Sequence, residues 1–179
     1  MTILTTERLT LTPVRADDYE DLCALWGDPV FATAIVSEAM TPEDVWFRLL
    51  RDIGQWQVLG FGSWTIRQTA SGDYIGGIAV LEHHRMMTPA FDAPEVGWGV
   101  APRFQGQGLA HEALSAVLDW CDGTLKAPRT VCMIDPDNAP SHALARRVGY
   151  APYAETFYKG APVVLLERPG PHHIAVASH

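Results

Sequence analysis

A glycine-rich turn between an apolar run and a helical pattern carries the residues with the clearest chemical use. Arg103 is followed at spacings of three and two by Gly106 and Gly108, and the helical pattern begins at Leu109. Two glycines allow the backbone to close around an anion, and the N–H groups of residues 105–110 then point into one concavity. The helix N-terminus adds roughly half a positive charge. The pattern predicts a binding site for a diphosphate group.

Two classes of cofactor are held by turns of this kind. A dinucleotide fingerprint, Gly-x-Gly-x-x-Gly, needs a third glycine at position 111, where the chain has His111. Asp135 could hold the ribose at the end of the next strand, but residues 101–105 separate the apolar run from Gly106, whereas a dinucleotide turn follows its strand directly. The spacing therefore favours the second form, Arg-x-x-Gly-x-Gly at the start of a helix.

The adjacent pair His83 and His84 is the feature most like a metal site. Neighbouring side chains on an extended backbone point in opposite directions, and no third ligand is spaced to join the pair. Cys23, Cys121 and Cys132 include no Cys-x-x-Cys pair. We therefore expect reduced cysteines, no disulfide framework and no metal site.

The elements that position these residues follow from the periodicity of apolar side chains. The predicted order is β-α-α-β-β-β-α-β-α-β-β, a mixed sheet with helices against it, which is an α+β fold. The strand before the glycine turn, the helix after it and the next apolar strand form one βαβ unit. The predicted elements are strands 8–14, 60–68, 74–81, 95–100 and 130–135, helices from about 17, 41, 109 and 139, and a closing hairpin over 154–167 around Lys159-Gly160.

Several helix ends carry local signals. Thr41 before Pro42 predicts an N-cap and a first helical residue, and Asn138 predicts the cap of a helix that Gly149 ends in the left-handed conformation. Asp17 with Glu20 predicts a capping box. The expected apolar faces are Val45, Leu49, Leu50 and Ile53 in the second helix, and Leu109, Ala113, Leu114, Val117, Leu118 and Trp120 in the third.

Composition limits the class of protein. The chain has 179 residues, 47% of them hydrophobic and 19% charged, with a formal net charge of −8. These values indicate one globular domain, which we place at residues 1–168, followed by a flexible tail over 169–179. The negative charge opposes general binding to nucleic acid, and no apolar run reaches the roughly 20 residues of a membrane helix. The first residues have no secretory signal pattern, so a cytoplasmic location is expected.

The glycine turn belongs to a wider pattern. Residues 138–141 read Asn-Ala-Pro-Ser, Gly149 precedes an aromatic residue, and residues 6–14 read TERLTLTPV. Together with Arg-x-x-Gly-x-Gly, these segments resemble the GNAT N-acetyltransferases, and among them the RimJ/RimL-like subgroup, from about residue 5 to 168. The resemblance implies the GNAT fold, a mixed and mostly antiparallel sheet of about seven strands with about four helices. It also implies acetyl-CoA as the cosubstrate.

The resemblance further implies which residues hold acetyl-CoA. By analogy, Asn138 contacts the pantetheine arm, Ser141 lies near the CoA sulfur, and the splayed strand 95–100 pairs with the pantetheine and directs a backbone N–H near Val100 at the acetyl oxygen. Two glycines in that strand are consistent with close approach of a backbone or of a ligand, or with a bulge. A helix cap is the plainer role for Asn138, and one side chain can serve both. The implied residues are Trp98, Gly99, Val100, Arg103, Gln105, Gly106, Gln107, Gly108, Leu109, Ala110, Asn138 and Ser141.

Acetyl transfer to an amine needs a base for the ammonium proton and an acid for the departing thiolate. The resemblance makes Glu95 the candidate base, because acids at this place in RimL-like relatives face the acceptor. The loop before that strand offers alternatives, namely Glu82, His83, His84 and Asp92.

The acid is the point where the chain departs from the family pattern. Many GNAT enzymes have a tyrosine four residues before the Gly-aromatic pair, and this chain has Ala145 there. The resemblance leaves Ser141 as the candidate acid, acting directly or through a relay. Tyr150 is expected to pack in the core.

The function implied is that of an N-acetyltransferase that acts on a primary amine, either of a small molecule or of a protein N-terminus, by direct attack in a ternary complex. A different class remains open, a module that binds acetyl-CoA without turnover. The acceptor half has no readable motif, and homodimers are common in the family. The apolar residues of the loop before residue 95 could form a lid or a satellite cluster; they are Met86, Met87, Pro89 and Phe91. Four tryptophans could shape a pocket or fill the core; they are Trp26, Trp46, Trp56 and Trp64.

Overall fold

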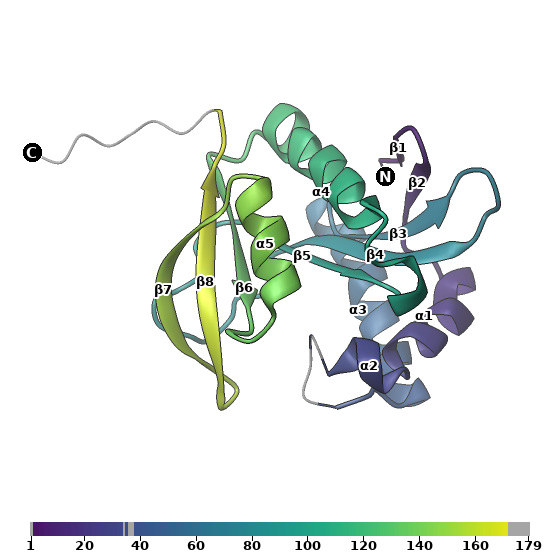
Figure 1. Ribbon diagram of the computed structural model, residues 1–179, viewed down its shortest axis with the longest axis horizontal. Coiled ribbons are helices and arrows are strands. Elements are labelled where there is room, and N and C mark those ends of the chain that lie inside the picture. The colour runs from purple at the N-terminus through teal and green to yellow at the C-terminus, as the bar shows by residue number, and fades with distance from the viewer. Residues whose placement is uncertain (1, 34, 36–37, 172–179) are drawn as a thin grey trace, which may run out of the picture. The chain divides into compact units, whose positions relative to one another are not determined.

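The structure is a computed structural model that describes residues 2–33, 35 and 38–171. Within these residues, eight strands form one sheet in the order β1-β2-β3-β4-β5-β6-β8-β7 (Figure 1). Strands β5 and β6 pair in parallel, whereas the pairs β1–β2, β2–β3, β3–β4, β6–β8 and β7–β8 are antiparallel. The mixed, mostly antiparallel sheet confirms the predicted fold class, with one strand more than expected. None of the helices in this part of the chain has the length and apolar character to cross a membrane.

The chain divides into two compact units, and the first comprises Met1–Leu81 and Gly97–Ala116. Its hairpin of β3 and β4 turns at Gly72, which has φ of +78°. Its elements are β1 (Leu4–Thr5), β2 (Leu9–Pro13), η1 (Ala16–Asp18), α1 (Tyr19–Trp26), α2 (Pro29–Ala32), α3 (Pro42–Leu59), β3 (Ser63–Gln68), β4 (Tyr74–Leu81), the end of β5 (Glu95–Val100), η2 (Pro102–Phe104) and most of α4 (Leu109–Trp120).

Helix α3 begins as its sequence predicts. The Asp44 N–H donates to Thr41 Oγ1 at 3.2 Å, the Thr41 N–H donates to Asp44 Oδ2 at 3.1 Å, and Pro42 is the first helical residue. This reciprocal pair satisfies two of the N–H groups that a helix start leaves without partners.

The capping box predicted at Asp17 and Glu20 is wrong. The chain first makes the 3-10 turn η1, and the Arg15 N–H donates to Asp18 Oδ2 at 2.8 Å. Asp18 is buried, and two side chains of β3 donate hydrogen bonds to its carboxylate, Thr65 Oγ1 at 2.9 Å and Arg67 Nη2 at 3.0 Å. Contacts with a distant strand therefore decide which aspartate caps this segment.

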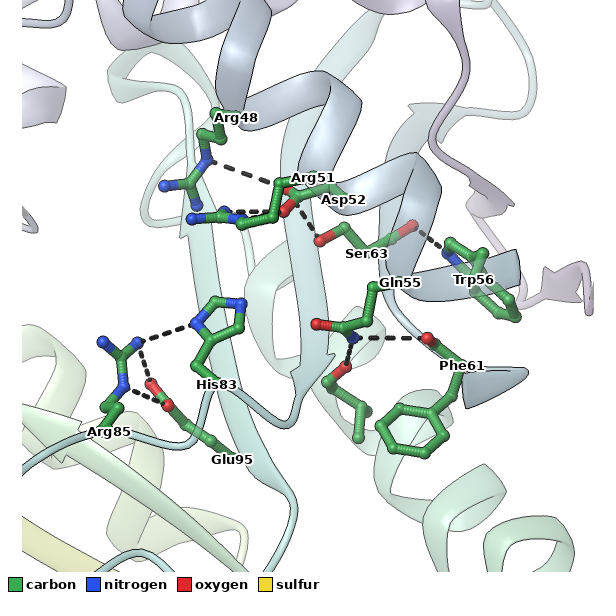
Figure 2. Close-up of polar contacts among 11 residues, drawn as sticks. Arg48, Arg51, Asp52, Gln55, Trp56, Phe61, Ser63, His83, Arg85 and Glu95 are labelled. Atoms are coloured by element: carbon green, nitrogen blue, oxygen red, sulfur yellow. Dashed lines mark hydrogen bonds and ion pairs between the residues drawn. The ribbon is translucent and has the colours of Figure 1, made fainter. Parts of the chain in front are cut away.

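The inward face of α3 is less apolar than predicted. Leu50, which was predicted to face inward, is 47% exposed, whereas Asp52 and Gln55 are buried. Gln55 Nε2 donates to the Val80 carbonyl at 2.8 Å and to the Phe61 carbonyl at 3.3 Å (Figure 2). These buried polar groups are hydrogen-bonded, which offsets the cost of removing them from water.

Asp52 also joins α3 to β3. Ser63 Oγ donates to Asp52 Oδ2 at 3.1 Å, and Arg51 Nε donates to Asp52 Oδ1 at 2.8 Å (Figure 2). Trp56 Nε1 donates to the Ser63 carbonyl at 2.8 Å. Ser63 thus contacts two consecutive turns of the helix, which fixes the position of α3 along the strand.

Aromatic residues make up much of the core of the first unit. Trp26, Trp56 and Trp64 are 6%, 4% and 1% exposed, so these three are core residues. Trp46 is 40% exposed and packs edge-to-face against Tyr19, with ring centroids 5.3 Å apart. One buried cluster joins α1, α2, α3 and β4 through Leu25, Trp26, Phe31, Val45 and Tyr74.

The second unit comprises Glu82–Val96 and Val117–His179. The β5–β6 pairing has Glu95 opposite Val131, and the closing hairpin turns at Lys159 and Gly160, which have φ of +50° and +83°; both features confirm predictions. Its elements are the start of β5, the end of α4, the π-helical turn η3 (Cys121–Leu125), β6 (Arg129–Ile134), α5 (Ala139–Arg147), β7 (Ala151–Tyr158) and β8 (Ala161–Pro169).

The end of the chain differs in part from the prediction. Pro169, which was expected to begin a flexible tail, is the last residue of β8. The Gly170 N–H then donates to the Pro128 carbonyl at 2.9 Å. The rest of the predicted tail, residues 172–179, lies outside the described residues.

Candidate active site

The glycine turn is an exposed loop of the first unit. It follows η2, occupies residues 105–108 and leads into α4 at Leu109. Gly106 and Gly108 have φ of +74° and +76°, a conformation that other residues rarely adopt. An α-helix leaves its first N–H groups without intrahelical acceptors, so the start of α4 presents donors directly after the turn. This backbone fits a diphosphate, because it combines a concave turn with the positive end of a helix.

Side chains of the turn stabilise the turn itself. Gln105 Nε2 donates to the Val100 carbonyl at 3.1 Å, and Gln107 Nε2 donates to the Arg103 carbonyl at 3.2 Å. Arg103 is exposed, and its guanidinium carbon lies 4.7 Å from the centroid of the Phe104 ring. The Gln105 N–H donates to the Pro102 carbonyl at 3.2 Å, so of the two glutamines Gln107 is the one whose backbone N–H can serve a ligand. Arg103 places a positive charge on the outer surface of the loop.

The two glycines of β5 have different surroundings. A Cβ on Gly99 would lie 2.6 Å from Phe31 Cζ and 3.1 Å from Ile35 Cδ1, so packing against the α2 region requires this glycine. This packing gives Gly99 a reason within the folded chain, and the approach of a pantetheine arm to its backbone stays a prediction. A Cβ on Gly97 would meet no atom within 4 Å. Residues two apart in a strand face the same side, so the space beside Gly97 remains open on that side.

Glu95 lies in the second unit and is 7% exposed. Arg85 Nε donates to Glu95 Oε2 at 2.6 Å and Arg85 Nη2 donates to Oε1 at 2.9 Å, a two-point ion pair (Figure 2). Arg85 Nη1 also donates to the Tyr158 hydroxyl at 2.8 Å. Burial alone would lower the pKa of Arg85, but the hydrogen bond and charge of Glu95 raise it overall, so this arginine stays charged.

Arg85 was not predicted as a site residue. The pair fixes the Glu95 carboxylate, and each carboxylate oxygen has a second lone pair that can accept a further hydrogen bond. Glu95 can therefore act as a base in two ways. It accepts the proton on a second lone pair while Arg85 holds both oxygens, or it first exchanges one of its two bonds to Arg85. A lone arginine in an irregular loop gives no periodic signal from which this contact could be predicted.

The alternative bases occupy different environments in the second unit. His83 Nδ1 lies 3.4 Å from Arg85 Nη2, whereas His84 is 87% exposed at its side chain and lies 3.7 Å from Glu82. Asp92 pairs with Arg129. Met86, from the predicted lid, is 96% exposed. Among residues 2–33, 35 and 38–171, no three His, Cys, Asp or Glu side chains gather as metal ligands.

Helix α5 places Asn138 and Ser141 at its start. The Ser141 N–H donates to Asn138 Oδ1 at 3.1 Å, which confirms Asn138 as the helix cap. Ser141 is half-buried in the first turn, and Ala145, at the place of the usual tyrosine, is fully buried. Gly149 follows with φ of +97°, the predicted left-handed end.

Tyr150 has the core position that was predicted. It is 3% exposed, and its hydroxyl lies 2.7 Å from Thr130 Oγ1. Burial raises its pKa far above the usual range, and the Thr130 hydrogen bond lowers it only in part. Tyr150 therefore stays neutral and buried.

Most of the chain matches a known protein family. Residues 8–151 match the family described as Acetyltransferase (GNAT) domain. The chain belongs to the GNAT family. It is an acetyltransferase, and acetyl-CoA is its cosubstrate. The glycine turn of residues 105–108 lies within the matched residues.

Solved structures of similar proteins cover most of the chain. A protein from Bordetella pertussis assigned to the GnaT acetyltransferase family is 31% identical and has a TM-score of 0.83, with 94% of this chain and 99% of that chain covered. RimL, a ribosomal L7/L12 α-N-protein acetyltransferase in complex with CoA, is 18% identical with a TM-score of 0.77, over 96% and 99% of the two chains. Spermidine N-acetyltransferase from Vibrio cholerae, in complex with CoA and spermine, is 16% identical with a TM-score of 0.74, over 94% and 99%. The last two similarities show the fold alone.

Proposed function

We propose that this protein transfers the acetyl group of acetyl-CoA to a primary amine, either of a small molecule or of a protein N-terminus, by direct attack in a ternary complex. The main support is the exposed turn in which Gly106 and Gly108 are left-handed and α4 begins, because backbone donors there can hold a diphosphate. RimL and spermidine N-acetyltransferase, which share the fold, act on a protein N-terminus and on a polyamine. Both acceptor classes are therefore compatible with the architecture.

Binding of acetyl-CoA is assigned to backbone groups and to one amide. We place its diphosphate on the N–H groups of residues 106–110 with Arg103 at the rim, because the predicted donor at Gln105 is taken by the Pro102 carbonyl. Its pantetheine arm lies along Trp98, Gly99 and Val100. Asn138 contacts the same arm through its side chain while it caps α5. Holding both reactants in one geometry can supply several kcal/mol of the barrier without covalent help from the protein.

Proton transfers complete the reaction. The thioester of acetyl-CoA is already activated, so the amine nitrogen can form the bond to the acetyl carbon as the C–S bond breaks. Glu95 takes the proton that the ammonium group loses, directly or through water, while Arg85 holds its carboxylate. Ser141 supplies a proton to the departing sulfur, either directly or as a relay that passes on a proton from solvent, and its hydroxyl is restored by solvent.

Calorimetry and a thiol-release assay test this function together. Acetyl-CoA is titrated into the protein, and CoA release is then followed with spermidine, free amino acids and peptides that begin with serine or alanine. Binding with amine-dependent release, and a product that mass spectrometry shows to carry one acetyl group, supports the proposal. Binding without release on any amine favours the binding module, and no binding refutes the assigned site.

Location and assembly are separate proposals. We propose a cytoplasmic protein that forms a homodimer. Light scattering coupled to size-exclusion chromatography tests the dimer, which a monomeric mass at micromolar concentration would refute.

A further inference from the structure

We propose that Arg8 is a positioning residue for the phosphates of acetyl-CoA, which it serves by holding the glycine turn and by presenting its charge beside Gly108. This inference rests on the function proposed above. Arg8 lies between β1 and β2, about a hundred residues from the turn in sequence, yet all the groups concerned belong to the first unit. Arg8 is not part of the Arg-x-x-Gly-x-Gly motif.

Arg8 joins the turn to the first turn of α4. Its Nη1 donates to the Gln107 carbonyl at 3.0 Å, while Nε and Nη2 each lie 2.7 Å from Glu112 Oε2. The planar guanidinium therefore spans a residue between the two loop glycines and a residue in the helix that follows. Because the group is rigid, these contacts fix the orientation of the Gln107 carbonyl.

Glu112 is itself held by four donors. Besides the two from the Arg8 side chain, Thr6 Oγ1 donates to Oε1 at 2.5 Å and the Arg8 N–H donates to Oε1 at 2.9 Å. Burial raises the pKa of Glu112, but the hydrogen bonds from Thr6 and Arg8 and the Arg8 charge lower it overall. The carboxylate is thus ionised and fixed, and it orients the arginine before any ligand arrives.

The guanidinium remains partly open to a ligand. The Arg8 side chain is 44% exposed, and its Nη2 lies 3.6 Å from the position that a Cβ would take on Gly108. The contacts described use three of the five N–H donors of a guanidinium, so two N–H groups remain for a further acceptor. A phosphate oxygen is the acceptor that suits it, because the neighbouring turn already presents backbone donors to a diphosphate.

The decisive comparison is between Arg8→Gln, Arg8→Lys and the control Arg15→Gln, which removes the same charge from an exposed arginine elsewhere in the first unit. Calorimetry measures the Kd of acetyl-CoA at low and high salt, and the thiol-release assay separates KM from kcat. Arg8→Gln should raise Kd roughly tenfold to hundredfold and flatten its salt dependence, with kcat at saturating acetyl-CoA little changed. Arg8→Lys should recover part of the affinity, and Arg15→Gln should match wild type.

Three outcomes would overturn the inference. The first is an unchanged Kd for Arg8→Gln at low salt. The second is a weaker Kd with an unaltered salt dependence, which would mean that Arg8 only supports the fold. The third is an Arg8→Lys variant that binds acetyl-CoA no more tightly than Arg8→Gln does. The affinity of Arg8→Lys also tests the inference in the case where Arg8→Gln is poorly folded. If wild type itself does not bind acetyl-CoA, the proposed function fails, and that result is distinct from all three.

Discussion

Replacing Gly108 by aspartate should abolish acetyl-CoA binding if the diphosphate lies in the glycine turn. The backbone there has φ of +76°, so any side chain adds about 1–2 kcal/mol of local strain. A carboxylate about 5 Å from a phosphate charge, at an effective dielectric constant of about 20, adds about 3 kcal/mol of repulsion, or a loss of affinity of roughly 200-fold. A Cβ at this position would also lie 3.6 Å from Arg8 Nη2, so the new carboxylate can compete for that arginine.

Two control variants separate these effects. Gly72→Asp introduces the same charge at a φ of +78° in a turn where a Cβ meets no atom within 4 Å, so it should cost similar stability and leave binding intact. Gly108→Asn keeps the shape without the charge, and should bind more tightly than Gly108→Asp by about the electrostatic factor. Calorimetry gives Kd, and urea unfolding gives stability. Wild-type affinity in Gly108→Asp would refute the placement of the diphosphate, and equal affinities of the Asp and Asn variants would refute the electrostatic explanation.

Four further predictions address the other candidate residues. Glu95→Gln should lower kcat by about 100-fold and remove one ionisation from the pH–rate profile; an unchanged profile would exclude Glu95 as the base. Ser141→Ala should slow turnover by a similar factor while the Kd of acetyl-CoA stays close to that of wild type, and a wild-type rate would leave Ser141 only a helix residue. Glu112→Gln should lower stability at pH 7, because the depressed pKa of Glu112 stabilises the fold above its unfolded value of about 4.3. That contribution is lost as pH falls through the folded pKa, so urea unfolding should show the difference from wild type shrinking towards pH 3, and a constant difference would contradict the assignment. Gly97→Ala should leave stability equal or higher by up to about 1 kcal/mol, because its Cβ meets open space; a weakened Kd for acetyl-CoA would then show a ligand passing there, and an unchanged Kd would count against it.

Local signals explain which parts of the fold could be predicted. Thr41 with Asp44, Asn138 with Ser141, and Lys159 with Gly160 act within three residues of each other, so the sequence carries the whole interaction. The cap of η1 was missed because Asp18 is chosen by donors 47 and 49 residues away. By local spacing alone, Asp17 and Asp18 are almost equally good candidates for the residue that caps this segment.

The same distinction applies to the candidate site. The residues from Arg103 to Gly108 are contiguous in the sequence, and the two glycines among them predict the left-handed backbone that the structure has at both positions. The partners of Glu95 and Glu112 could not be predicted, because Arg85 lies in a loop without periodicity and Arg8 lies 104 residues from Glu112. In both pairs, tertiary contacts decide what a carboxylate can do.

The glycines of β5 show why residue type alone gives an incomplete account of this site. Gly97 and Gly99 are equivalent in the sequence pattern, and both are unfavourable in a strand unless something requires them. At Gly99 the requirement is internal, since Phe31 and Ile35 occupy the space where a side chain would be. At Gly97 an added Cβ would meet no atom within 4 Å, so the contacts of the described chain give no reason for a glycine. A pantetheine arm along β5 would supply that reason, which makes Gly97, rather than Gly99, the residue of this strand whose type argues for a ligand.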